Sequence, residues 1–365
     1  MLKPRIGIIS ALTKECWARR ALLESPKEFD VPGRGAGHRY YVGEISGQSG
    51  GKHTVVLCLS GVGNNSAAIR ATLLLEHFPS IDSIIMVGIA GGVPNPTNAE
   101  EHIRLGDIVV SDRGGVVQYD FGKEIATTIE GKTTVEFVEK SAPRPPSAVL
   151  LESVSLLEVE EYEGHQPWVD HINAVLKQFR VSRPPSETDL LFSTDDSSKV
   201  VDHPHDPSRT PRQPRLFTGK IASAGIVLKN PVKRDHLRDE FGVKAVEMEG
   251  SGVADASWNA GVGYLVVRGI CDYCDSKKNK AWQKYAAIAA AGYVRALIES
   301  MPSSDRRSEY RKAGELRGVP THSNVDEYLT AMKVFSETDS YMTLHEHSGG
   351  SHVPLLLRRK NPRSD

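Results

Sequence analysis

The chain has 365 residues and a formal net charge of −1, with 39% hydrophobic and 25% charged residues. This composition excludes a largely disordered chain, and the balanced charge gives no indication of binding to nucleic acid or to an anionic membrane. Four cysteines are too few for a disulfide framework, so we expect a cytoplasmic protein with reduced thiols.

The first apolar run, from Ile6 to Leu12, follows basic residues, as in a secretory signal peptide. It is short for such a segment, and charged residues resume at Lys14. We therefore expect it to form the first buried β-strand. No apolar run approaches the roughly 20 residues that cross a bilayer.

Short runs rich in Val and Ile recur along the chain, and most are too continuous for half-exposed strands. Helical patterns with cap residues or many alanines lie between them. Alternating strands and helices predict a three-layer α/β/α fold with a mixed, largely parallel central sheet. The expected strands lie at 5–11, 53–63, 81–93, 106–112, 220–228 and 262–272, and the expected helices at 64–78, 248–261 and 279–300.

Two regions depart from this pattern. Residues from about 188 to 217 are rich in Pro, Asp, Ser and Arg, which predicts a long surface insertion. Residues 303–365 are polar with scattered apolar positions, which predicts a partly disordered tail. We expect one catalytic domain over 1–302.

Two glycine-rich loops follow buried strands, "SGVGNNS" at 60–66 and "VGIAGGV" at 87–93. In an open α/β sheet, ligands bind beyond the carboxyl ends of the strands, where glycine allows a close backbone approach. Neither loop has the spacing of a phosphate-binding P-loop. Each could equally be a tight strand-to-helix turn.

Four acids are candidates for the site: Glu15 shortly past the first predicted strand, Glu247 and Glu249 on either side of Met248, and Asp272 at the end of the strand 262–272. Singly, each could be a solvated or helix-capping acid. Together they predict a site that places one acid and one base on opposite sides of a bond. In a regular strand Glu247 and Glu249 would share one side, with Met248 opposite. For Met248 and Glu249 to face one ligand, the backbone must turn from strand to helix there.

Seven motifs resemble the nucleoside phosphorylase and nucleosidase superfamily and occur in its order, over about residues 5–300. They are "RIGIISALTKE", "SGVGNNSAA", "VGIAGGV", "RLGDIVVSD", "GKIASAGIVL", "AVEMEGSGVADA" and "VVRGICDYCD". Two further stretches, "GGVVQYDFGK" and "RGICDYCDSKKNKAWQKYAAIAAA", resemble the N-terminal domain of fungal nucleotide-binding, repeat-containing immune-type receptors.

The resemblance implies cleavage of a purine nucleoside or nucleotide without a cofactor or metal. Glu249 would hydrogen-bond the ribose hydroxyls, with Met248 packed on the sugar. Asp272 would protonate or hydrogen-bond purine N7, and Glu15 would activate the attacking water. The positions implied beside the nucleophile are Gly88, Ile89, Ala90 and Gly91, and those beside the base are Val227 and Leu228.

The chemistry is consistent with these roles. Cleavage builds an oxocarbenium-like ribose and a poor anionic leaving group, so a general acid at the base and a carboxylate near the sugar both help. Asp272 would have to be protonated and Glu15 ionised, so the site would have to separate two carboxyl pKa values.

Hydrolysis is favoured over phosphorolysis, because a phosphate dianion needs fixed positive charge. Related phosphorylases carry an Arg where this chain has Met86, and nucleosidases a loop serine where it has Ile89. Arg5, Arg104 or Arg268 could still supply that charge.

Lys277, Lys278 and Lys280 lie beside Asp272 in "DSKKNK". They are either a solvated helix start or a clamp for the phosphates of a nucleotide such as ATP. Cys271 and Cys274 form a C-x-x-C around Asp272, but their context does not match a redox or metal site. A different class of function is a non-catalytic ligand-sensing or oligomerising module of a signalling protein. In either case we expect a homo-oligomer.

Overall fold

The computed structural model of the protein describes residues 3–31, 39–48, 50–129, 132–140, 144–277 and 280–302. The predicted tail at 303–365 and Lys278 lie outside the described residues. In the described part of the chain, no helix is both long enough and apolar enough to span a bilayer.

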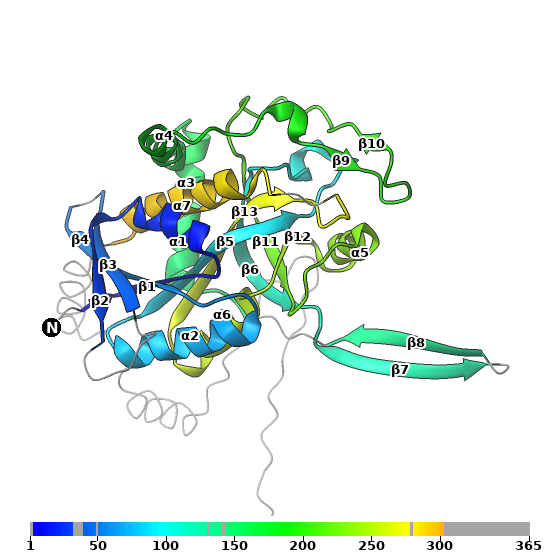
Figure 1. The fold of residues 1–365 in the computed structure, drawn as a ribbon, viewed down its shortest axis with the longest axis horizontal. Coiled ribbons are helices and arrows are strands. Elements are labelled where there is room, and N and C mark those ends of the chain that lie inside the picture. Colours follow the sequence, from blue (N-terminus) through cyan, green and yellow to red (C-terminus); the bar gives the residue numbers. More distant parts are fainter. Residues whose placement is uncertain are drawn as a thin grey trace, which may run out of the picture. The chain divides into compact units, whose positions relative to one another are not determined.

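A nine-stranded sheet forms the centre of the fold (Figure 1). Its strands are β1 (Ile6–Ser10), β2 (Glu24–Asp30), β3 (Arg39–Ser46), β4 (Lys52–Leu59), β5 (Ser83–Gly92), β6 (Ile108–Gln118), β11 (Leu216–Ser223), β12 (Val243–Glu247) and β13 (Gly263–Asp272). They are ordered β12-β11-β6-β13-β5-β1-β4-β3-β2. The six predicted strands are all present as β1, β4, β5, β6, β11 and β13.

The sheet is mixed, as predicted, and the strands that pair with β5 bring three strand ends close together. β4, β1, β5 and β13 run parallel, so their carboxyl ends share one edge. Near its end β5 also pairs antiparallel with β12, with Gly91 opposite Val246. A register shift in β13 then places Asp272 beside Gly91. The ends of β5, β12 and β13 therefore converge at one place.

Helices cover both faces of the sheet and complete the predicted three layers (Figure 1). α7 packs on β5 and β13 and is itself covered by α1, α3 and α4, while α2 and α6 pack together on the opposite face and α5 lies against β12. The helix bounds are α1 (Thr13–Arg20), α2 (Asn64–His77), α3 (Ala148–Tyr162), α4 (Pro167–Phe179), α5 (Pro231–Phe241), α6 (Gly250–Asn259) and α7 (Gln283–Ser300).

Small residues let α7 lie close to the sheet. The alanines from Ala286 to Ala291 are nearly all fully buried, and a Cβ on Gly269 of β13 would collide with the carbonyl oxygen of Ala286. The helix backbone therefore reaches the strand backbone directly, which holds the end of β13 rigidly against α7.

Several elements were not predicted from the sequence. Among them are α3 and α4, which both pack on α7, and β7 (Gly122–Ile129) and β8 (Lys132–Glu139), which form a separate two-stranded hairpin. Apolar side chains such as Ile129 and Val135 on this hairpin are exposed.

The predicted insertion begins at the end of a 3-10 turn (Ser186–Thr188) and contains a short hairpin of β9 (Leu191–Phe192) and β10 (Val200–Val201). Its last two residues, Leu216 and Phe217, already belong to β11 and are buried. The segment outside the sheet therefore ends at about residue 215.

Candidate active site

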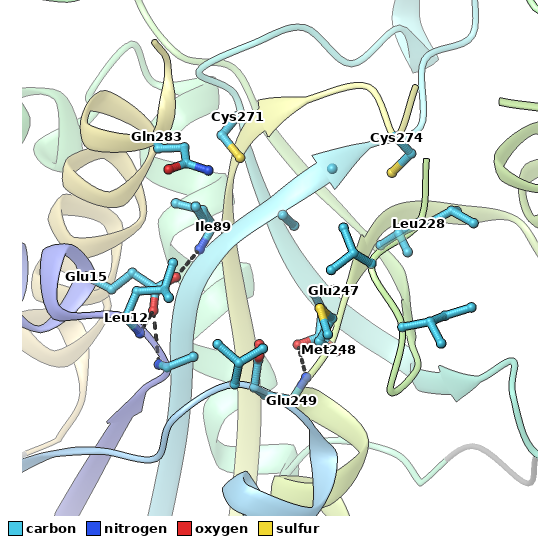
Figure 2. Close-up of a pocket in the computed structure, with 17 residues that line it drawn as sticks. Leu12, Glu15, Ile89, Leu228, Glu247, Met248, Glu249, Cys271, Cys274 and Gln283 are labelled. Carbon is cyan, nitrogen blue, oxygen red and sulfur yellow. Dashed lines mark hydrogen bonds between the residues drawn. The ribbon is translucent and has the colours of Figure 1, made fainter. Parts of the chain in front are cut away.

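A mostly apolar pocket lies where β5, β12 and β13 end (Figure 2). Figure 2 shows Glu15 beside Leu12 and Ile89, and Glu249 beside Met248, with strand β5 running between them. The pocket is lined by the apolar or small residues Ala11, Leu12, Val62, Ile89, Ala90, Gly91, Ile226, Val227, Leu228, Val246 and Met248, the carboxylates Glu15, Glu247 and Glu249, the thiols Cys271 and Cys274, and Gln283.

Glu15 is held at the pocket wall by backbone N–H groups. It lies in the first turn of α1, where its Oε2 accepts hydrogen bonds from the N–H groups of Ala11 (3.0 Å) and Leu12 (2.8 Å) that precede the helix. Its Oε1 accepts a third from Ile89 of β5 (2.8 Å). Such back-bonding is half of a capping box. It fixes the carboxylate between α1 and the glycine loop.

The stretch "VEMEG" contains the predicted turn from strand to helix. β12 ends at Glu247 and α6 begins at Gly250, with Glu249 at the N-cap in a non-extended conformation (φ −129°, ψ −25°). The carboxylate of Glu247 accepts hydrogen bonds from the N–H groups of Glu249 (2.9 Å) and Gly250 (2.8 Å). Glu247 therefore caps α6, and Glu249 and Met248 line the pocket beside it.

Arg268 of β13 is fully buried between the two acids of this turn. Its Nη2 donates to Glu247 and, at 3.3 Å, to Glu249. Its Nε and Nη1 find no hydrogen-bond partner among the described residues. Burial alone would lower the pKa of Arg268, but the carboxylates of Glu247 and Glu249 raise it above its ordinary value. The site thus contains a fixed positive charge directly behind its carboxylates.

Glu249 is the acid whose protonation is most altered by this environment. Burial raises its pKa to about 7, against the opposing charge of Arg268 and with a further rise from Glu247. Its Oε1 accepts a hydrogen bond from the N–H of Gly63 at the start of α2 (3.1 Å). Near neutral pH the group can exist as a carboxylate that accepts hydrogen bonds from hydroxyls.

The predicted loop Gly88 to Gly91 lies beside Glu15, but its members differ in position. Ile89, Ala90 and Gly91 line the pocket, whereas Gly88 does not. A Cβ on Gly88 would lie 2.5 Å from Oε1 of Glu15 and closer still to Nη1 of Arg268. Gly88 therefore leaves room for these two charged groups to approach the strand.

Asp272 is buried at the end of β13 and does not line the pocket itself. Its Oδ1 accepts a hydrogen bond from the N–H of Cys274 (3.0 Å), and its Oδ2 accepts one from the thiol of Cys271 (3.1 Å). Both cysteines do line the pocket. Cys274 has a positive φ of 55°, which is uncommon for a residue other than glycine and marks a tight turn after Asp272.

Val227 and Leu228, predicted to lie beside the base, both line the pocket. Leu228 is buried, whereas Val227 is about half exposed at the rim, together with Ile226 and Val62. Ile226 and Val62 were not predicted from the sequence as site residues.

Apart from Arg268, the basic residues considered from the sequence lie away from the pocket. The Lys277 ammonium is 5.6 Å from the centre of the Phe192 ring, and neither Lys277 nor Lys280 lines the pocket. Arg5 pairs with Asp82, and Arg104 pairs with Asp189. Among the described residues that line the pocket, none is Lys or Arg.

Comparison with known proteins agrees with this geometry. A family model described as "Phosphorylase superfamily" matches residues 5–299. The chain belongs to the phosphorylase superfamily. This confirms the superfamily resemblance of the sequence motifs.

Two relatives illustrate the similarity. A nucleotide-binding leucine-rich repeat (NLR)-like protein from Hyaloscypha variabilis is 33% identical to this chain over 80% of the chain. The matching region covers only 29% of that protein's length. A 5′-methylthioadenosine/S-adenosylhomocysteine nucleosidase from Mycobacterium bovis is 27% identical over 81% of this chain and 96% of its own length.

Solved structures of superfamily members share the fold. An S-adenosylhomocysteine nucleosidase from Streptococcus pyogenes, in complex with 5-methylthiotubericidin, aligns over 83% of this chain and 99% of its own, with a TM-score of 0.54 and 23% identity. The futalosine hydrolase of Helicobacter pylori aligns over 81% of this chain and 98% of its own, with a TM-score of 0.52 and 18% identity.

Proposed function

We propose that this protein hydrolyses the N-glycosidic bond of a purine nucleoside. One observation carries the proposal: Glu15 and Glu249, from distant parts of the chain, meet in one mostly apolar pocket in front of the buried Arg268. Such a pocket can exclude bulk water around a sugar while presenting carboxylates to it. The relatives named as nucleosidases support the same reaction class.

In the proposed reaction, Glu249 accepts hydrogen bonds from the ribose hydroxyls and Met248 packs against the sugar. Glu15 takes a proton from a water whose oxygen bonds to the anomeric carbon as the bond to the purine breaks. Asp272, which lies beside Gly91 of the pocket lining, delivers a proton to the departing base, so the base leaves neutral. The carboxylates of Glu15 and Glu249 favour the positive charge that develops on the ribose.

The charge distribution supports water over phosphate as the nucleophile. A phosphate dianion is bound in proteins by cations, most often Arg, in direct contact. Arg268 already donates to Glu247 and Glu249, and no described lining residue is basic. The same reasoning supports a nucleoside over ATP, because Lys277 stacks on Phe192 away from the lining.

The test is release of free base from adenosine, inosine, 5′-methylthioadenosine and ATP, followed by chromatography. We expect base release from at least one of the three nucleosides and little from ATP. Release from ATP alone would contradict the preference for nucleosides, and no release from any of the four would contradict the hydrolase proposal.

The similarity to a receptor-like fungal protein supports a second candidate, a non-catalytic nucleoside-sensing module. A sensing module would bind its ligand in the same pocket as the enzyme. Calorimetry of adenosine binding, combined with an assay for adenine release, therefore distinguishes the two functions. Saturable binding of adenosine without release of adenine from it would support the sensing module, whereas binding followed by release supports the enzyme.

A further inference from the structure

The segment 186–215, which lies outside the sheet, is attached to the turn that carries Asp272. Asp189 of this segment has a fully buried side chain. Its Oδ1 accepts a hydrogen bond from the hydroxyl of Tyr273 (2.6 Å), and its Oδ2 pairs with Arg104 (2.8 Å). Burial, and then the Asp189 charge, raise the pKa of Tyr273 well above its ordinary value, so the hydroxyl remains a donor.

A second contact reaches the backbone of the same tyrosine. Nη1 of Arg234 in α5 donates to the carbonyl oxygen of Tyr273 (2.8 Å). Nη2 of Arg234 in turn donates to the hydroxyl of Thr194 in the 186–215 segment (3.1 Å), which itself donates to Asp235 (2.6 Å). Tyr273 is therefore held by hydrogen bonds to both its side chain and its main chain.

Two further contacts hold the chain beyond the turn. The indole N–H of Trp282 donates to the hydroxyl of Thr188 (3.1 Å), and the Lys277 ammonium lies over Phe192. The 186–215 segment thus contacts the chain from Tyr273 to Trp282 at several points, although none of its described residues lines the pocket.

The position of Tyr273 bears directly on Asp272, its neighbour in the chain. The backbone bends sharply after Tyr273, where Cys274 has a φ of 55° and donates its N–H to Asp272 Oδ1. A shift of the Tyr273 backbone would move this N–H and the Asp272 carboxyl together. Displacements of about 1 Å at a reacting group can lower a rate about 100-fold.

We propose that the 186–215 segment positions the Asp272 carboxyl for proton transfer, with Tyr273, Asp189 and Arg234 as positioning residues. The inference rests on the proposed function, in which Asp272 protonates the leaving base. In this proposal the insertion holds the acid against the base, while other elements bind the ribose and the attacking water.

The test uses two substrates that differ in their need for an acid. Adenosine loses a purine that needs a proton, whereas 4-nitrophenyl β-D-ribofuranoside loses a stable phenolate that needs none. Tyr273→Phe removes one hydroxyl and leaves Asp189 paired with Arg104. The matched control is Tyr264→Phe, which removes a buried hydroxyl in β13 that donates to the carbonyl oxygen of Arg144. Asp272→Asn is the reference for loss of the acid.

We expect Tyr273→Phe to lower kcat for adenosine about 10- to 100-fold with little change in KM, and to change the nitrophenyl reaction by less than about 2-fold. Asp272→Asn should show the same selectivity with a larger loss, and Tyr264→Phe should change neither substrate. Equal losses on both substrates would overturn the inference, because they would indicate general damage to the pocket. So would a Tyr273→Phe variant that behaves like Tyr264→Phe.

A milder variant covers the case in which Tyr273→Phe does not fold. Thr194→Val removes the hydroxyl that holds Arg234 and lies outside the core. We expect a smaller fall in kcat for adenosine, again with an unchanged KM; a changed KM with an unchanged kcat would overturn the inference. If the wild-type protein cleaves no nucleoside, the proposed function fails and the inference fails with it. If the wild type is active but these variants are not selective, only the inference fails.

Discussion

At the scale of single residues, Glu15 is the group whose proposed role can be tested most directly. Three backbone N–H groups hold its carboxylate, so Glu15→Gln would keep one oxygen acceptor but turn an amide N–H₂ toward those donors. The amide also cannot take a proton from water. We expect kcat for nucleoside hydrolysis to fall about 100-fold or more. A variant with wild-type turnover in a steady-state assay would remove Glu15 from the role of base.

Glu249 makes the stability of the protein depend on pH. Its pKa is about 7 in the folded protein and near the ordinary 4.5 in an unfolded chain. The stabilisation is therefore fully present below about pH 4.5 and is lost as the pH rises through 7, to a total of up to about 3 kcal/mol.

Glu249→Gln removes this titration, so urea unfolding of both proteins near pH 5 and pH 8 measures it. We expect the variant to gain stability relative to the wild type between the lower and the higher pH. A stability difference that is the same at both pH values would show that the pKa of Glu249 is not raised.

Residue types and spacing in the sequence were enough to predict the turn at "VEMEG", because two acids around Met248 cannot serve one ligand from a straight strand. They were not enough to predict what Glu247 does. Its role depends on Arg268, which is a neighbour only because β12 crosses to pair with β5 beside β13. A charged residue inside the apolar run of β13 was the available signal.

At the scale of elements, the buried pair of Glu247 and Arg268 joins β12, α6 and β13. Both side chains are fully buried, so removing the Glu247 charge leaves Arg268 with only its longer contact to Glu249, at 3.3 Å. We expect Glu247→Gln to lower the free energy of unfolding by about 3 kcal/mol or more. The control is Asp255→Asn, which breaks the exposed pair with Arg144 and should cost less than about 1 kcal/mol. Similar losses in urea unfolding would contradict this difference.

The glycine loop of β5 gives a second prediction at this scale. In Gly88→Ala the new methyl group would collide with Glu15 and Arg268, which must then move. We expect kcat/KM for nucleoside hydrolysis to fall about 100-fold, because two groups of the site are displaced. In Gly225→Ala the methyl group meets only Oδ2 of Asp120, at an ordinary 3.5 Å, and should have little effect. Equal activity of the two variants would show that the loop tolerates a side chain.

Alternation of apolar runs and helical patterns predicted the three layers and the strands that carry the site. The same pattern did not lead to a prediction of the β7–β8 hairpin or of α4. The β7–β8 hairpin is rich in Thr and charge and buries neither face, so it lacks the usual strand pattern. α4 does show a helical apolar spacing, with Trp168, Ile172 and Val175 buried, and could have been predicted.

At the scale of the whole molecule, the insertion shows why position cannot be predicted from composition. Its Pro, Asp and Ser content predicted a surface segment, yet Asp189 and Leu191 are buried against the core. Which part of the core they reach depends on long-range contacts with Arg104 and Tyr273, which local composition does not encode.

The central claim is that water, and not phosphate, attacks the sugar. The most direct measurement is the product formed from the best nucleoside substrate with no phosphate and with phosphate in excess. None of the described residues that line the pocket is basic, so the site has no cation to bind phosphate. We therefore predict the same rate with and without phosphate, and free base and free ribose as products. Base release that requires phosphate and yields a sugar 1-phosphate would contradict the account.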